Sequence, residues 1–210
     1  SSLQGVLEHV SDPKLFLLDF KKIMHNESLL LIEVPNFENN KSDLLTIDHF
    51  SKFTENSISN IFNATGFEIV KKQILSKVPM QYVIKKSEVK DIITDDATKY
   101  LNKAVEYFQK IIDDAKKLEN KKIAVYGQGL IFEYLIGSKI LNIKNVTCII
   151  DDNPLYHNKL WKNTLSIFDF HTFEKKFHTK KIFLAMSDCY HIKVTDKLSN
   201  YEVYGALNQK

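Results

Sequence analysis

Two short segments near the start of the chain each place an acidic residue beside a histidine. Glu8-His9 follows the apolar pair Val6-Leu7, and Asp48-His49 lies in a loop after an apolar run at 28–34. A histidine with a neighbouring carboxylate can act as a general base, and ligands bind at the carboxyl ends of strands in open α/β sheets. Taken alone, each pair is more typical of a helix-capping acid and a surface histidine, with the catalytic interpretation as the alternative.

A third candidate is the turn Gly127-Gln128-Gly129, which follows an apolar segment at 122–126. Glycines after a first strand let the backbone approach a phosphate, and Asp151, about 20 residues later, stands where an acid can bind ribose. Phe132 occupies the third glycine position of the G-x-G-x-x-G pattern. Gly127, Gln128, Gly129 and Asp151 therefore predict a nucleotide or nucleotide-sugar contact, with a purely structural turn as the alternative. An NAD-dependent oxidoreductase is disfavoured by Phe132 and by the lack of a catalytic set beside the turn.

Composition limits the classes of partner. Hydrophobic residues make up 44% of the 210 residues, and the 29 basic residues are offset by 26 acidic ones. The small net charge of +3 argues against a nucleic-acid partner. No apolar segment approaches the roughly 20 residues of a membrane span, and the first residues do not resemble a secretory signal. We therefore expect a cytoplasmic protein that acts on a small molecule and does not contact a membrane.

The sequence predicts no metal site anywhere in the chain, since the other histidines lack ligand spacing and the two cysteines do not supply it. The histidines without ligand spacing are His25, His157, His171, His178 and His191. Cys148 and Cys189 lie far apart in apolar segments, which predicts buried free thiols rather than a disulfide.

Residues 1–87 alternate helix and strand patterns. Asp12-Pro13 begins a helix, and Thr54 with Glu55 caps a second helix that ends at Gly66. The first helix has an apolar face made of Leu15, Phe16, Leu18, Phe20 and Ile23. The predicted strands are 28–34, 67–70 and 80–84. The first is apolar enough to be buried on both faces, and the other two form an antiparallel pair.

Two further regions follow. Residues 88–120 have helical spacing and predict a connector, either one long helix or two helices joined near 94–96. Residues 121–210 return to alternating strands and helices, which predicts a small parallel sheet of Rossmann type. The strands expected there are 122–126, 146–150, 181–186 and 202–207, with a helix at 130–140.

Four blocks of the first region together resemble the class I S-adenosylmethionine-dependent methyltransferases. Residues 6–13, followed by Phe16-Leu17, are similar to the segment after the fourth strand of that fold. Residues 29–36 resemble its fifth strand, 48–54 the following loop and helix start, and 65–70 its sixth strand. The resemblance implies an α/β fold with an incomplete methyltransferase sheet, strands four to seven, then the connector and the Rossmann-like domain.

In the third region, Tyr126-Gly127-Gln128-Gly129 and residues 150–154 stand where the C-terminal domain of the sugar C-methyltransferases has its turn and its second strand end, and the region resembles that domain. The resemblance implies that His9 and His49 lie at the active site, with Asp48 as the acidic partner. It also implies that Glu8 and His9 lie near the S-adenosylmethionine. The implied role is removal of a proton from the sugar carbon beside a keto group, followed by attack on the methyl group. Thr46 stands where those enzymes have a tyrosine, so O- or N-methylation of a sugar-like substrate stays open.

The elements that bind the methyl donor in this family precede the block at 6–13. We therefore expect the cofactor-binding half to lie outside this chain, which alone would be inactive. The chain would then be a fragment, a degenerate protein, or one half that pairs with a separate or identical subunit. The strand at 29–34 would have an unpaired apolar flank. A non-catalytic module that binds a nucleotide or nucleotide sugar is the alternative to a methyltransferase.

Overall fold

The computed structural model describes residues 1–74, 79–92 and 98–205. The chain folds into two compact units, Ser1–Lys103 and Ala104–Lys210, with the boundary inside helix α3, Thr98–Lys116. The expected connector at 88–120 is thus shared between the units: the buried residues of α3 from Ala104 onward belong to the second unit. Residues 87–92 are not helical, and the expected join at 94–96 lies outside the described residues.

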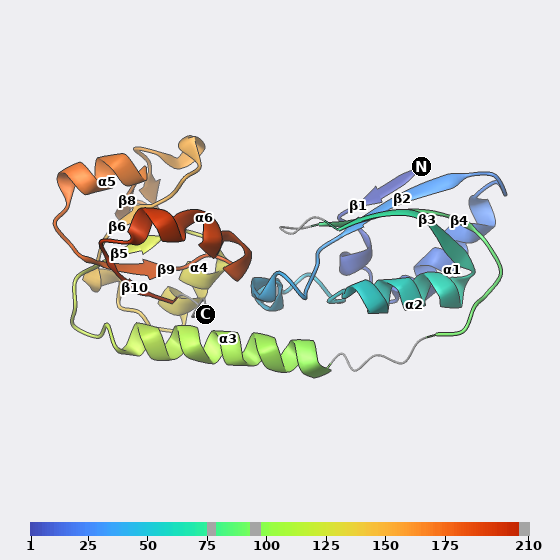
Figure 1. Cartoon of the computed structure of the whole chain (residues 1–210), viewed down its shortest axis with the longest axis horizontal. Helices are drawn as coiled ribbons and strands as arrows, with labels where there is room; N and C mark the ends of the chain where they lie inside the picture. Colours follow the sequence, from blue (N-terminus) through green and yellow to red (C-terminus); the bar gives the residue numbers. More distant parts are fainter. Residues whose placement is uncertain (75–78, 93–97, 206–210) are drawn as a thin grey trace. The chain divides into compact units, whose positions relative to one another are not determined.

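The first unit contains a four-stranded sheet in the order β1-β2-β4-β3 (Figure 1). Its strands are β1 (Ser2–Gln4), β2 (Leu29–Val34), β3 (Phe67–Ile74) and β4 (Met80–Lys86). β1 pairs with β2 in parallel, and β4 pairs antiparallel with both β2 and β3. The expected antiparallel pair is confirmed. The expectation of an unpaired flank on β2 is wrong, because β2 has a partner on each side and β1 forms that edge of the sheet.

Helices α1 (Pro13–Ile23) and α2 (Glu55–Thr65) cover the same face of this sheet (Figure 1). Leu30, Ile32 and Val34 on β2 are fully buried in the core that these helices close. Leu29 on the other face is half exposed. The prediction that β2 is buried on both faces is wrong, because the helices of this unit cover only one of them.

Both helices begin where the sequence places them. Asp12 caps α1 by accepting a hydrogen bond from the Leu15 amide at 2.8 Å, and Thr54 forms a capping box with Ser57. Gly66, with a φ of 71°, ends α2 in the left-handed conformation that glycine adopts without strain. The predicted apolar face of α1 is only partly correct. Its buried residue is Leu17, which lies between the half-buried Phe16 and Phe20, whereas Leu15 and Ile23 are exposed.

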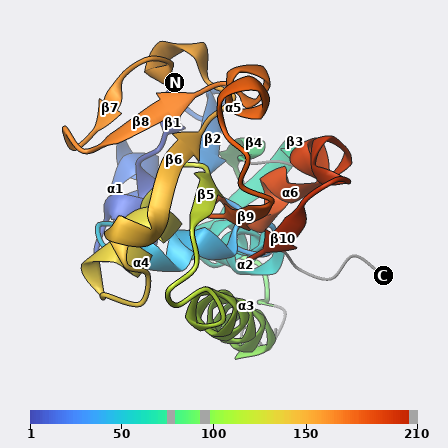
Figure 2. The same ribbon diagram turned by 90° about the vertical axis from the view of Figure 1, so that its left-hand side faces the viewer.

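The second unit contains a six-stranded sheet in the order β10-β9-β5-β6-β8-β7, which Figure 2 shows side by side. All neighbouring strands are parallel except the antiparallel pair β7–β8. The strands are β5 (Ile123–Tyr126), β6 (Val146–Ile150), β7 (Leu160–Trp161), β8 (Leu165–Phe168), β9 (Lys181–Leu184) and β10 (Glu202–Tyr204). The α/β class and the parallel sheet are as predicted.

Helices α4 (Leu130–Gly137), α5 (Phe170–Lys176) and α6 (His191–Thr195) connect these strands. β7, β8, α5 and α6 were not predicted from the sequence, because their segments are short and carry no long periodic pattern. Among the described residues, no helix is both long and apolar enough to cross a bilayer.

Neither Cys148 nor Cys189 forms a disulfide, as predicted. Cys148 is buried on β6, and burial raises the pKa of its thiol to about 12. Cys189 is only half-buried and lies on a short 3-10 helix at Asp188–Tyr190 rather than on a strand. The expectation of two buried thiols therefore holds for Cys148 alone.

Candidate functional site

Two distant segments of the first unit place His9 and His49 side by side. His9 ends a 3-10 helix, Leu7–His9, which follows β1 and is anchored by the fully buried Leu7. His49 lies in the segment after β2, beyond a second 3-10 helix at Lys41–Leu45. The two imidazole rings meet edge to face, with their centroids 4.7 Å apart and their planes at 81°. Since β1 and β2 are parallel, their carboxyl ends lie at the same edge of the sheet, and the two histidines follow from there.

Asp43 is the acidic partner of His49. Its Oδ1 lies 2.6 Å from His49 Nδ1, and its side chain is almost completely buried. The sequence predicted Asp48 for this role, whereas in the structure the carboxylate that contacts His49 Nδ1 is that of Asp43. Asp48 lies in a turn closed by a hydrogen bond from the His49 amide to the Thr46 carbonyl oxygen, whereas Asp43, on the 3-10 helix Lys41–Leu45, contacts the His49 ring. No sequence pattern distinguishes Asp43 from the other loop acids, so sequence reasoning missed it.

Asp48 instead contacts His9. Its backbone carbonyl oxygen lies 3.0 Å from His9 Nδ1, and its carboxylate, on a side chain that is 74% exposed, lies 3.4 Å from the same nitrogen. A carbonyl oxygen can only accept, so His9 Nδ1 carries the hydrogen. The Asp43 carboxylate imposes the same tautomer on His49. In both neutral rings the Nε2 lone pair is therefore available to bind a proton or another electrophile.

Lys52 stabilises the loop that carries His49. Its ammonium group donates hydrogen bonds to the backbone carbonyls of Thr46, at 2.9 Å, and His49, at 3.0 Å. It also lies 3.9 Å from Asp43 Oδ2. Burial lowers the pKa of Lys52, and the nearby carboxylates of Asp43 and Asp48 only partly oppose this effect. These bonds fix the path of the loop and with it the position of the His49 ring.

Glu8 adds a buried carboxylate to the histidine pair. The residue is only 3% exposed, and its Oε2 receives no hydrogen bond from any of the described residues. One ligand atom each from Glu8, His9 and His49 can be chosen so that all three lie within 4.8 Å of one another. We refer to Glu8, His9 and His49 as the histidine cluster.

In the second unit, the predicted turn has the geometry that its glycines suggest. Gly127 has a φ of 92°, and a Cβ there would lie 3.2 Å from the Ala185 carbonyl oxygen, so any other residue would be strained at this position. Gly129 precedes α4, and a Cβ there would meet no atom within 4 Å. Gln128 Nε2 lies 3.4 Å from Asp151 Oδ2. The structure thus brings together the residues that the sequence singled out, at the carboxyl ends of β5 and β6.

Several polar side chains beside this turn form hydrogen bonds with one another. The Tyr126 hydroxyl donates to Asp152 at 2.7 Å, and Lys197 donates to the same carboxylate at 3.1 Å. Burial alone would raise the pKa of Asp152, but these two donors outweigh it and lower the pKa below its ordinary value. Phe132 is fully buried, with its ring 4.8 Å from that of Trp161. The third glycine position of a dinucleotide site is therefore filled by a core side chain.

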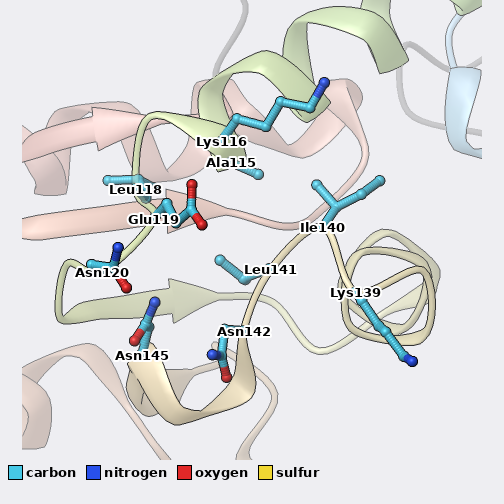
Figure 3. Close-up of a pocket in the computed structure, with 10 residues that line it drawn as sticks. All are labelled: Ala115, Lys116, Leu118, Glu119, Asn120, Lys139, Ile140, Leu141, Asn142 and Asn145. Atoms are coloured by element: carbon cyan, nitrogen blue, oxygen red, sulfur yellow. The ribbon is translucent and has the colours of Figure 1, made fainter.

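A pocket of about 420 Å³ lies elsewhere in the second unit (Figure 3). Its walls come from the end of α3 and the segment after α4, and include Glu119, Asn120, Lys139, Asn142 and Asn145. None of the residues that the sequence analysis singled out lines this pocket. Its volume therefore adds nothing to the chemical argument.

Comparisons with known proteins do not assign the chain to a family. No protein-family model matches the chain, and a search of curated protein sequences finds no match.

Proposed function

We propose that the first unit is part of an S-adenosylmethionine-dependent methyltransferase that acts on a nucleotide sugar or a related glycan precursor. The observation that carries this proposal is the pair His9–His49, with Nδ1 of each ring held by an oxygen acceptor. Such a pair after the carboxyl ends of two parallel strands stands where substrates bind in open α/β sheets. The four strands β1 to β4 also supply the number that the resemblance expects, strands four to seven.

In the proposed reaction, His49 Nε2 removes a proton from the sugar carbon beside a keto group. The Asp43 carboxyl group contacts Nδ1 and stabilises the resulting imidazolium, and it acts as a positioning residue because it reaches the substrate only through His49. Bound S-adenosylmethionine supplies the electrophilic methyl group: a carbon–carbon bond forms, the sulfur–methyl bond breaks, and the sulfur keeps the electron pair. Glu8 Oε2, which is buried and has no hydrogen-bond donor among the described residues, would accept a hydrogen bond from a hydroxyl or amine of that cofactor.

The test uses the natural protein that carries this sequence, with labelled S-adenosylmethionine and a keto-sugar nucleotide. Replacing His49 by alanine should lower the turnover number by about 100-fold or more, because a general base contributes that much. His25→Ala, at an exposed histidine of the same unit, is the matched control and should leave turnover unchanged. An unchanged rate in His49→Ala would remove this residue from the mechanism.

A second experiment separates carbon methylation from O- or N-methylation. If His49 removes a carbon-bound proton, the protein should exchange that proton with deuterium from D₂O in the absence of a methyl donor. His49→Ala should abolish the exchange. Methylation without any exchange in the unaltered protein would favour transfer to oxygen or nitrogen, the alternative that Thr46 leaves open.

We propose as a second candidate that the turn at Gly127–Gly129 binds the nucleotide part of a nucleotide sugar. The open space at Gly129 and the position of Asp151 after β6 support this proposal. Calorimetric titration with UDP and with a UDP-sugar tests it, with Asp151→Asn and Gly129→Val as the variants. Both should bind at least about 10-fold more weakly if ribose and phosphate contact these residues. Equal binding by both variants would leave the turn with a structural role only.

A further inference from the structure

We infer that the histidine cluster, Glu8, His9 and His49, binds one divalent transition-metal ion. The three side chains come from two segments that are distant in sequence, which explains why ligand spacing along the chain gave no sign of a site. Two imidazoles and one carboxylate form a donor set that Zn²⁺, Co²⁺ and Fe²⁺ accept, with further positions left for water or substrate. Mg²⁺ and Ca²⁺ prefer sites made of oxygen ligands only.

The hydrogen bonds behind the two histidines are those that metal-binding histidines make. A ligating imidazole usually donates its second ring N–H to a carboxylate or a backbone carbonyl, which fixes the tautomer and the ring orientation. His49 Nδ1 has the Asp43 carboxylate at 2.6 Å, and His9 Nδ1 has the Asp48 carbonyl at 3.0 Å. His49 therefore has a carboxylate as its acceptor and His9 has a backbone carbonyl, which are the two common types. The Nε2 atom of each ring remains available to a metal.

Glu8 provides the independent observation that points to a ligand. A buried carboxylate oxygen without a hydrogen-bond donor is costly, and such atoms call for a specific explanation. Glu8 Oε2 is in this situation within the part of the chain that the structure describes, and the carboxylate belongs to the same cluster as the two rings. A bound cation would compensate its charge where no protein donor does.

The distances require only a small contraction. In a tetrahedral site with bonds of about 2.0–2.1 Å, neighbouring donor atoms lie about 3.3 Å apart. One ligand atom of each residue, a carboxylate oxygen or a ring nitrogen, lies within 4.8 Å of the other two, and small shifts of the Glu8 side chain and of the half-exposed His9 side chain would shorten these distances. Lys52 holds the backbone of His49 in place, so the movement falls on the side chains of Glu8 and His9.

Metal binding would also control the proposed methyl transfer. The Nε2 lone pair of His49 can hold either a metal ion or the proton of the substrate, so the two uses exclude each other. This consequence rests on the proposed function, whereas the metal site itself does not. Zn²⁺ should therefore inhibit methyl transfer in the natural protein, and a chelator should restore it.

The direct test is calorimetric titration of the complete 210-residue chain, without a polyhistidine tag, with Zn²⁺ at pH 7.5. We expect one site per chain. His49→Ala and Glu8→Gln should each weaken Zn²⁺ binding at least about 100-fold, and Asp43→Asn about 10- to 100-fold, since it removes only a supporting contact. His25→Ala should bind as the unaltered chain does. Co²⁺ should give a visible absorption spectrum that His49→Ala abolishes, and Mg²⁺ should give no saturable binding.

Circular dichroism of each variant establishes that it is folded before its affinity is compared. Equal Zn²⁺ affinity in the unaltered chain, His49→Ala and Glu8→Gln would overturn the proposal, and so would saturable Mg²⁺ binding at the same site. Because no methyl donor or sugar is present, a negative methyl-transfer assay leaves this result unaffected. Conversely, a chain that transfers methyl groups but binds no Zn²⁺ would overturn the metal site alone.

Discussion

The two units place candidate residues after the carboxyl ends of parallel strands, but they differ in what those residues do for each other. In the second unit, Asp152 is already bonded to Tyr126 and Lys197. In the first unit, oxygen acceptors bind Nδ1–H of His9 and of His49. The buried Glu8 Oε2 has no hydrogen-bond donor among the described residues. Residues at similar positions in the two units therefore differ in the chemistry that they can do. Polar groups that saturate one another stabilise a unit, and groups that leave lone pairs available can bind or react.

The largest expected effect concerns Phe132, the core side chain that fills the third glycine position of the dinucleotide-binding pattern. Phe132→Ala should lower the free energy of unfolding of that unit by about 3–5 kcal/mol, because it removes a fully buried aromatic ring. Urea unfolding followed by the fluorescence of Trp161, the single tryptophan, measures this loss. Leu130→Ala, at a half-exposed position on the same helix, is the control and should cost less than about 1 kcal/mol. Similar losses in both variants would contradict the assigned role of Phe132.

The next effect tests which acid serves His49. Asp43→Asn should lower the turnover number for methyl transfer about 10- to 100-fold with little change in KM, since the base remains but its imidazolium loses a charged partner. Asp48→Asn should cost less, because the backbone carbonyl that holds His9 is unchanged. Asp43→Glu should recover part of the activity if the carboxylate, and not the fold around it, is responsible. A larger loss in Asp48→Asn than in Asp43→Asn would restore the assignment made from sequence.

The smallest effect concerns the bonded groups of the second unit. Tyr126→Phe removes the hydroxyl that donates to Asp152 and should lower the free energy of unfolding by about 1 kcal/mol at pH 7. The pKa of Asp152 is lowered in the folded state, so this contribution is present above the ordinary carboxyl pKa of about 4 and disappears as the pH falls through the folded value. Unfolding of both proteins at pH 7 and pH 3 measures it, with Tyr156→Phe as an exposed control. A difference that grows toward pH 3 would contradict the assigned bond.

The sequence predicted most of the elements correctly because their signals are local. The caps at Asp12 and Thr54, the glycine at 66 and the apolar run of β2 depend on neighbouring residues. Burial of β2 was predicted less well, since apolar content does not reveal that the helices cover only one face. The histidine pair was singled out by residue type. Its contact partner Asp43 was missed, because that contact depends on the path of a loop and not on spacing.

The central claim is that oxygen acceptors hold Nδ1–H of both histidines and leave both Nε2 lone pairs available. Long-range ¹H–¹⁵N correlation spectra of the ¹⁵N-histidine-labelled chain at pH 8 read the tautomer of each ring directly. The structure predicts that His9 and His49 both carry the hydrogen on Nδ1. Asp43→Asn should change the His49 signals and leave those of the exposed His25 unchanged. If His9 and His49 instead carry the hydrogen on Nε2, neither ring can act as the proposed base or bind a metal through that atom.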